Sequence, residues 1–142
     1  MIDPRGPRFA AGIASVVLAA VLLTGSAWLL TAQVAVFATT AAFGAGASPY
    51  GRLYALAVRP RIGPPARMED ERPPRFAQGV GFAFGAVGLA GLLAGVSAVF
   101  YVAVGLALAA AFLNAAFGFC LGCELYLLTR RITTRNTEVI TP

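Results

Sequence analysis

The sequence predicts an all-α integral membrane protein, with four transmembrane helices arranged as two hairpins in a single membrane domain over residues 1–142. Composition is the first reason. The chain is 58% hydrophobic and 12% charged, with a mean hydropathy of +0.77, and soluble domains of average composition do not reach such values. The second reason is charge spacing. Residues 9–51 and 76–123 carry no charge, and each stretch is about twice the ~20 residues that one helix needs to cross a bilayer.

Turn residues divide each uncharged stretch into two helices. Glycine next to small polar residues interrupts the apolar pattern at Gly25 in the first stretch and at Gly95 in the second, and this combination favours a turn. Each stretch therefore predicts one hairpin of two spans. The expected transmembrane helices span residues 9–24, 27–46, 77–94 and 98–128.

The segments outside these helices are polar. Residues 52–75 contain six arginines and five prolines around an acidic run, and repeated prolines favour an extended backbone. We therefore expect a short, partly ordered strap, which is either a solvated linker or a docking surface for a soluble partner. The polar tail at residues 132–142 is expected to be frayed.

The positive charges predict the orientation in the membrane. All eleven are arginines: two precede the first helix, six lie in residues 52–75 and three follow the fourth helix, while the two turns carry none. By the positive-inside rule, both termini and the loop at residues 52–75 are cytoplasmic. The basic excess is therefore a topology signal and not a nucleic-acid interface. The apolar run after Arg8 also continues beyond the about 7 to 15 residues of a signal-peptide core, so we expect no cleaved signal.

The two predicted hairpins repeat one another in sequence. Pro-Arg-Phe-Ala-x-Gly begins the first at residues 7–12 and the second at residues 74–79. Residues 41–56 can be aligned on residues 115–128 with a two-residue gap, through a shared Ala-Ala-Phe-Gly and a shared Leu-Tyr. The aligned pairs include Ser48 with Cys120, Gly51 with Cys123 and Arg52 with Glu124. Because both hairpins begin on the same side, the sequence predicts a parallel 2+2 pseudo-repeat about the membrane normal.

A set of short motifs extends along nearly the whole chain. They are DPRGPRF from Asp3, SPYG from Ser48, RPRIGPP from Arg59, PRFAQ from Pro74 and NAAFGFCLGCELY from Asn114. Together they resemble a bacterial integral membrane family catalogued as domain of unknown function 4395. The resemblance implies a four-helix protein of the bacterial plasma membrane. It also implies thioredoxin-like or rhodanese-like partners, because the Asn-x-x-x-Gly-x-Cys segment is similar to small membrane domains that accompany rhodanese sulfurtransferases.

Cys120 and Cys123 are the two cysteines of the chain. On a helix, residues three apart share a face with Cα atoms about 5 Å apart, inside the range of roughly 4.4 to 6.8 Å that a disulfide accepts. Counted inward from Arg130, the pair lies roughly 10 to 15 Å from the cytoplasmic edge. Because the cytoplasm keeps thiols reduced, we expect a transient disulfide and not a permanent one.

The surroundings of the pair decide whether the thiols react. In the C-terminal half of an unbroken helix, burial, the helix dipole and Glu124 would all disfavour a thiolate. A helix break at Gly118 or Gly122 would reverse this by placing the cysteines at a helix N-terminus, and so would a nearby cation. The repeat makes Arg52 the candidate cation, since it would face Glu124 and pair with it. The predicted catalytic residues are Cys120, Cys123, Glu124 and Arg52, with Ser48 and Asn114 in support.

Two alternatives for the cysteines stay open. Zinc or an iron–sulfur cluster needs about four protein ligands, and the chain has one cysteine pair and no histidine. We therefore expect no metal and no cofactor, unless Cys120 and Cys123 are shared across a dimer. The cysteines would otherwise be small packing residues. The glycine-rich third helix, with Gly81 and Gly85 four residues apart, permits close packing within the chain or in a homo-oligomer.

The sequence thus predicts a membrane-embedded thiol protein. Its Cys-x-x-Cys pair takes part in thiol redox or in sulfur (persulfide) relay with a soluble thioredoxin-like or rhodanese-like protein in the cytoplasm. One alternative is a non-catalytic membrane scaffold or subunit. Another is small-solute transport near Ser48, Arg52 and Glu124, which would need an oligomer, because four helices leave little room for a pore.

Overall fold

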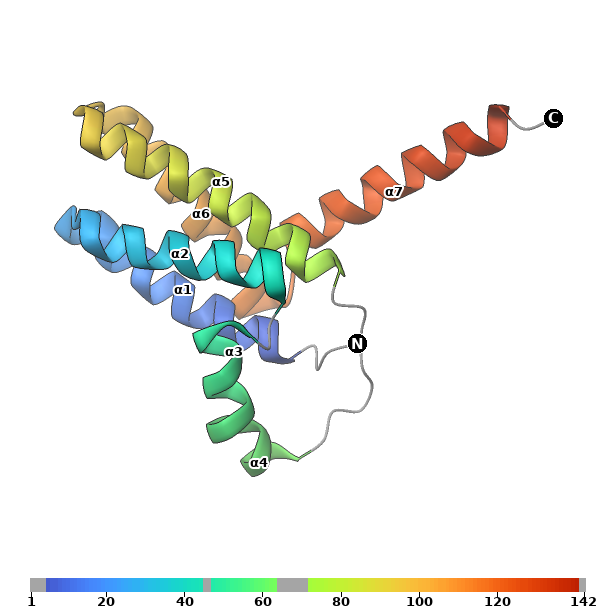
Figure 1. Ribbon diagram of the computed structural model, residues 1–142, viewed down its shortest axis with the longest axis horizontal. Coiled ribbons are helices and arrows are strands. Elements are labelled where there is room, and N and C mark those ends of the chain that lie inside the picture. The colour runs from blue at the N-terminus through green and yellow to red at the C-terminus, as the bar shows by residue number, and fades with distance from the viewer. Residues whose placement is uncertain (1–4, 45–46, 64–71, 141–142) are drawn as a thin grey trace.

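The computed structural model is helical throughout the part it describes, which comprises residues 5–44, 47–63 and 72–140, with the backbone alone for residues 134–140. Two helical hairpins lie side by side with their turns at the same end (Figure 1). The first consists of α1 (Arg5–Thr24) and α2 (Ala27–Phe43), and the second of α5 (Arg72–Ala94) and α6 (Ser97–Phe117). The predicted all-helical fold is confirmed.

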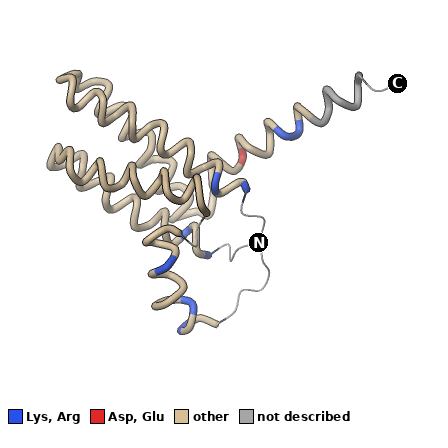
Figure 2. Tube along the Cα trace, viewed as in Figure 1, with Lys and Arg blue, Asp and Glu red and all other residues tan. Residues whose placement is uncertain are grey.

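Three of the hairpin helices, α1, α5 and α6, are long and apolar enough to cross a membrane. The fourth, α2, is equally apolar in character but has 17 residues. The charged residues gather away from the hairpin turns, at the opposite end of the bundle and on the helices that project from it (Figure 2). This division of apolar and charged segments is that of a multi-pass membrane protein.

Both hairpins turn at a glycine in the left-handed region, as predicted. The φ angle is 66° at Gly25 and 78° at Gly95, values that glycine adopts without a steric penalty. Ser26 then begins α2, because its hydroxyl accepts the Leu29 N–H at 3.2 Å and so satisfies one of the unpaired donors at the helix start.

The hairpins pack against each other through two pairs of helices, α1 with α6 and α2 with α5. Helix α5 also packs against α6 within the second hairpin. The core is a cluster of apolar side chains from α1, α2 and α6: Ala14, Leu18, Val21, Leu30, Phe37, Phe100, Val104 and Ala107. Helix α5 meets this core with glycines. A Cβ would lie 2.8 Å from Val34 Cγ2 at Gly85 and 2.7 Å from Val104 Cγ2 at Gly88, well inside the carbon–carbon optimum of about 3.5 to 4.0 Å. Both glycines are therefore used for packing within the chain.

The two hairpins make matching contacts at the end away from their turns. Arg8 Nη2 donates to Ala115 O at 3.4 Å, at the end of α6. Arg75 Nε donates to Ala41 O at 3.1 Å, at the end of α2. The sequence alignment pairs Arg8 with Arg75 and Ala115 with Ala41. Each arginine thus binds the carbonyl end of a helix in the other hairpin, where a cation is favoured by the helix dipole.

Aromatic contacts follow the same correspondence. Phe9 and Tyr54 have ring centroids 5.7 Å apart at an angle of 47°, and the matching rings of Phe76 and Tyr126 are 5.6 Å apart at 48°. Here Phe9 and Phe76 come from the Pro-Arg-Phe-Ala motifs, and the tyrosines come from the Leu-Tyr motifs. The aligned residues therefore occupy corresponding positions in space.

The second helix of each hairpin ends earlier than predicted. Helix α2 stops at Phe43 and not at residue 46, and the helix predicted over residues 98–128 is two helices, α6 and α7 (Leu121–Ile140). A glycine with positive φ follows each end, with 90° at Gly44 and 67° at Gly118. The apolar composition continues across both breaks, which is why hydropathy alone did not reveal them.

The predicted extended strap is also wrong where the structure describes it. A helical arm of α3 (Pro49–Leu53), a π-helical segment (Tyr54–Val58) and α4 (Arg59–Ile62) packs on α1, and α5 already begins at Arg72. Pro49 and Pro60 lie in first turns, where proline is tolerated. Residues 64–71, with the acidic run, lie outside the described part. The segment predicted to be frayed from residue 132 continues as helix α7 to Ile140.

Candidate functional site

Cys120 and Cys123 form a disulfide at the beginning of α7. Their Cα atoms are 5.1 Å apart, close to the separation that the sequence predicts. Cys120 immediately precedes the helix, and its Sγ accepts the Cys123 N–H at 3.1 Å. The N–H of Glu124 donates to Cys120 O at 3.0 Å. Cys120 therefore caps the N-terminus of α7.

The break at Gly118 gives the cysteines a different environment from the one expected in an unbroken helix. Gly118 ends α6 by donating its N–H to Asn114 O at 3.0 Å with a φ of 67°. A new helix then starts at Cys120. Unpaired N–H groups and the positive end of the helix dipole favour a negative sulfur at this position. Of the two features predicted to restore thiol reactivity, the helix break is present.

A cation next to this break is Arg8, which the sequence predicts only as a topology signal. The Arg8 Cζ lies 3.5 Å from the point where a Cβ of Gly118 would be. The shared Pro-Arg-Phe-Ala motif was the signal that could have identified it. Arg52, the predicted cation, lies on α3, which packs against α1, whereas Glu124 lies on α7, which packs against α5 (Figure 1). The structure thus places Arg52 and Glu124 on different sides of the bundle.

Ser48 has the same backbone role in the first hairpin that Cys120 has in the second. Its hydroxyl accepts the Gly51 N–H at 3.5 Å, and the Arg52 N–H donates to Ser48 O at 3.0 Å. The alignment of Ser48 with Cys120 and of Gly51 with Cys123 therefore holds at the level of hydrogen bonds. Because a hydroxyl and a glycine stand in place of two thiols, sulfur chemistry belongs to the second hairpin alone.

Cys120 lines a cavity of about 300 Å³ between the hairpins, with walls from α1, α2, α5, α6 and the start of α7. This volume is at the lower end of the roughly 300 to 1,000 Å³ of small-molecule sites. Most of the lining is apolar. Gln78 and Asn114 are the amide residues that line it, and neither side chain has a hydrogen-bond partner in the described part of the chain. The structure thus brings Asn114, a predicted supporting residue, to the same cavity as Cys120.

Aligned residues around this cavity differ in size between the two hairpins. Ala107 lines it, where the first hairpin has the buried Gln33. Gly122 lines it, where the first hairpin has Tyr50, whose hydroxyl donates to Gln33 Oε1 at 2.6 Å. A bulky hydrogen-bonded pair therefore fills the first hairpin, and the second leaves space next to Cys120.

Of the three amides in or near the spans, Gln33 bonds to another helix through Tyr50, whereas the side chains of Gln78 and Asn114 have no partner in the described part of the chain. Burial raises the pKa of the Tyr50 hydroxyl above its ordinary value, so the hydroxyl stays protonated and continues to donate. Gln33 Nε2 is buried and has no partner among the described residues.

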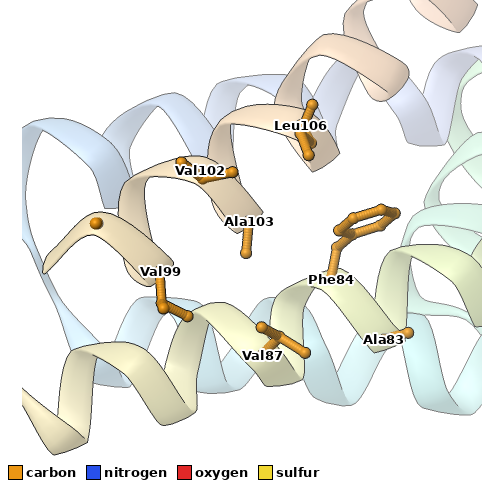
Figure 3. A pocket seen from close by; sticks show the side chains of 8 residues that line it. Ala83, Phe84, Val87, Val99, Val102, Ala103 and Leu106 are labelled. Carbon is orange, nitrogen blue, oxygen red and sulfur yellow. The ribbon is translucent and has the colours of Figure 1, made fainter. Parts of the chain in front are cut away.

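A second hollow, an apolar groove, lies along α5 and α6 (Figure 3). It has a volume of about 520 Å³ and is lined by Ala83, Phe84, Val87, Ala98, Val99, Val102, Ala103 and Leu106. Phe84 and Leu106 also line the cavity. Figure 3 shows these two side chains at one end of the groove and Val99 at the other. The linings of cavity and groove thus share two side chains, and we call the two hollows together the track along the second hairpin.

Metal binding has no support from clustering of ligands in the described part of the chain. No group of three His, Cys, Asp or Glu residues that could hold an ion occurs there. In the described part of the chain, the site therefore consists of the Cys120–Cys123 disulfide, the Arg8 guanidinium, the side chains of Gln78 and Asn114, and an apolar cavity.

The sequence matches a known protein family. A family model described as Domain of unknown function (DUF4395) matches residues 2–131. No curated protein and no solved structure matches the chain. The matched range includes both hairpins, the helical arm and the first half of α7, and so contains every residue of the site.

Proposed function

The chain belongs to the DUF4395 family, and we propose that it is a bacterial membrane protein in which the Cys120–Cys123 disulfide exchanges electrons with a partner dithiol. The position of the disulfide carries this proposal, because Cys120 caps α7 and a helix N-terminus stabilises the thiolate that exchange must release. Arg8 next to Gly118 adds a positive charge nearby.

The exchange begins when a partner thiolate attacks Cys123 Sγ. The Cys120–Cys123 bond breaks, a mixed disulfide forms on Cys123, and Cys120 leaves as a thiolate that accepts the Cys123 N–H. The second thiol of the partner then attacks the partner's own sulfur in the mixed disulfide and releases Cys123 as a thiol. Two electrons pass from the partner dithiol to the cysteine pair.

The charge distribution supports a partner in the cytoplasm. Arginines gather at the end of the bundle that also contains the disulfide (Figure 2), and the positive-inside rule assigns that end and both termini to the cytoplasm. Helix α2, with 17 residues, reaches the lower limit of about 17 for a span. The matching contacts of the hairpins support a parallel 2+2 arrangement of four spans. The arm offers the exposed Arg59 and Arg61 to a thioredoxin-like or rhodanese-like protein.

Maleimide labelling of the protein in its membranes tests the proposal. The pair should resist labelling as isolated and accept two labels after treatment with a water-soluble dithiol. The trapping probe is a thioredoxin whose resolving cysteine is replaced by serine. It should form a mixed disulfide with Cys123 of the Cys120→Ser protein, after that protein has been reduced and its Cys123 thiol has been activated. Ser48→Ala, which changes the aligned residue of the first hairpin, is the matched control and should exchange normally.

Two results would contradict this function. A pair that stays unlabelled after reduction is inaccessible, and a pair that never exchanges with the probe is structural. A Cys120→Ser/Cys123→Ser protein with unchanged partner binding and unchanged cell phenotype would instead support the scaffold alternative.

A further inference from the structure

The track formed by the cavity and the groove changes in polarity along its length. At the cavity end, the polar residues Gln78 and Asn114 line it together with Cys120. At the groove end all lining side chains are apolar, up to Val99 near the turn of the hairpin. A ligand that fits both ends has a small polar head and a long apolar tail.

The length of the track supports an extended ligand. From Val99 to Asn114 along α6 the distance is roughly 22 Å at the helical rise. The two hollows share Phe84 and Leu106 in their linings, so a ligand with its head in the cavity and its tail in the groove would pass these two side chains. The groove opens on the outer face of α5 and α6, where Val87 and Val102 are 52% and 61% exposed, and where acyl chains surround a membrane helix.

The lining excludes a charged head. None of the described residues that line the cavity is charged, so a phosphate would enter without a counter-ion, which is costly in an apolar site. Gln78 and Asn114 each offer a free amide N–H to a neutral carbonyl oxygen. A flat, neutral ring that carries two carbonyls and an isoprenoid tail satisfies these conditions.

From this geometry we infer that the track binds an isoprenoid quinone and that the quinone oxidises the reduced Cys120–Cys123 pair. The inference rests on the proposed dithiol exchange and supplies its electron acceptor. In the step, two S–H bonds break and one S–S bond forms. The two electrons and two protons pass to the quinone, whose carbonyl oxygens become hydroxyls. The complete cycle transfers electrons from a partner dithiol to the quinone pool.

The test uses the full chain in detergent, reduced with a dithiol, freed of it, and mixed with decylubiquinone. We expect loss of the ultraviolet absorbance of the oxidised quinone, one quinone reduced per chain, and parallel loss of maleimide labelling at Cys120. Asn114→Leu and Gln78→Leu should each raise the quinone concentration for half-maximal rate about tenfold, as expected for one lost hydrogen bond.

Leu106→Trp tests the tail, because Leu106 lines both the cavity and the groove. It should raise the half-maximal concentration of decylubiquinone about tenfold and that of a tail-less benzoquinone much less. Phe112→Trp is the matched control, since Phe112 lies on the same helix, is 54% exposed against 52% for Leu106, and lines neither hollow. Its kinetics should equal those of the unmodified chain.

The outcomes separate this inference from the proposed function. In one outcome the pair exchanges with the thioredoxin probe but does not reduce quinone. In another it reduces quinone without saturation and equally fast in Leu106→Trp and Phe112→Trp. Either result means that the quinone site is wrong and that dithiol exchange stands. If neither the probe nor the quinone reacts with the pair, both proposals fail.

Discussion

Arg8 connects the start of α1 to the end of α6, next to the glycine that separates α6 from α7. Its guanidinium donates to Ala115 O and lies against Gly118, two residues before Cys120. A positive charge at this place favours the thiolate over the thiol. If the proposed dithiol exchange holds, the residue links the packing of the hairpins to the reactivity of the sulfur.

Replacing Arg8 by glutamine should slow the reaction of the reduced pair with maleimide at neutral pH. We expect about a 1.4- to fivefold decrease, which corresponds to the ~0.2 to 1 kcal/mol of an exposed charge interaction. Arg75→Gln is the control, because Arg75 makes the matching contact at the end of α2. Equal rates in both variants would show that the charge of Arg8 does not act on Cys120.

Gly118 illustrates how one residue sets the direction of the chain after α6. Gly118→Ala should destabilise the protein by about 1 to 2 kcal/mol, because φ is 67° there and a side chain is strained in that region. Gly105→Ala on the same helix should be neutral or stabilising by up to about 1 kcal/mol, since a Cβ there meets nothing within 4 Å. Thermal unfolding in detergent measures both, and a Gly118→Ala protein as stable as Gly105→Ala would contradict the strain argument.

At the scale of elements, the position of α7 depends on its contact with α5. A Cβ at Gly122 would lie 2.5 Å from both Cα and Cβ of Ala77, so the helices are as close as their backbones permit. The contact between Phe76 and Tyr126 lies in the same interface. Helix α7 thus leaves the bundle at an angle that this glycine permits (Figure 1).

Gly122→Val should force α7 away from α5 at a cost of about 1 to 3 kcal/mol, the usual range for overpacking. The measurement is oxidative cross-linking of Phe76→Cys with Tyr126→Cys, in a chain whose own cysteines are serine. The yield should fall severalfold when Gly122→Val is added. The matching pair, Phe9→Cys with Tyr54→Cys, should be unaffected, and a loss of both cross-links would indicate general unfolding.

Hydropathy and glycine position predicted the elements that depend on local sequence. Gly25 and Gly95 interrupt apolar runs next to polar residues, so both turns were identified. Gly118 lies between Phe117 and Phe119 in an apolar run, so the break between α6 and α7 gave no contrast in composition. Prolines such as Pro60 were interpreted as extended backbone, although the first turn of a helix accepts them.

The candidate site was predictable only in part, because its remaining features depend on packing between helices. Cys120, Cys123 and Asn114 were identified from their residue types. The cavity follows from the difference between Ala107 and Gln33, which matters only after α2 and α6 have taken equivalent positions around the core. Arg52 was assigned to Glu124 from the alignment alone, and the alignment does not say that aligned helices α3 and α7 project to different sides.

For the whole molecule, the positive-inside assignment makes a direct prediction about topology. In a chain whose own cysteines are serine, Thr133→Cys should react with a membrane-impermeant maleimide in inside-out vesicles, and Ser97→Cys at the hairpin turn should not. Right-side-out vesicles should give the reverse pattern. Labelling of both positions from the same side would exclude two complete hairpins.

The reciprocal arginine contacts also determine the order in which the protein can be completed during synthesis. Helix α2 is synthesised before Arg75, and Ala41 O receives its guanidinium only when the second hairpin arrives. Arg8 in turn waits for Ala115, near the end of α6. Neither hairpin is therefore a finished unit on leaving the ribosome, and a nascent chain that stops before α5 should be held by the insertion machinery or degraded.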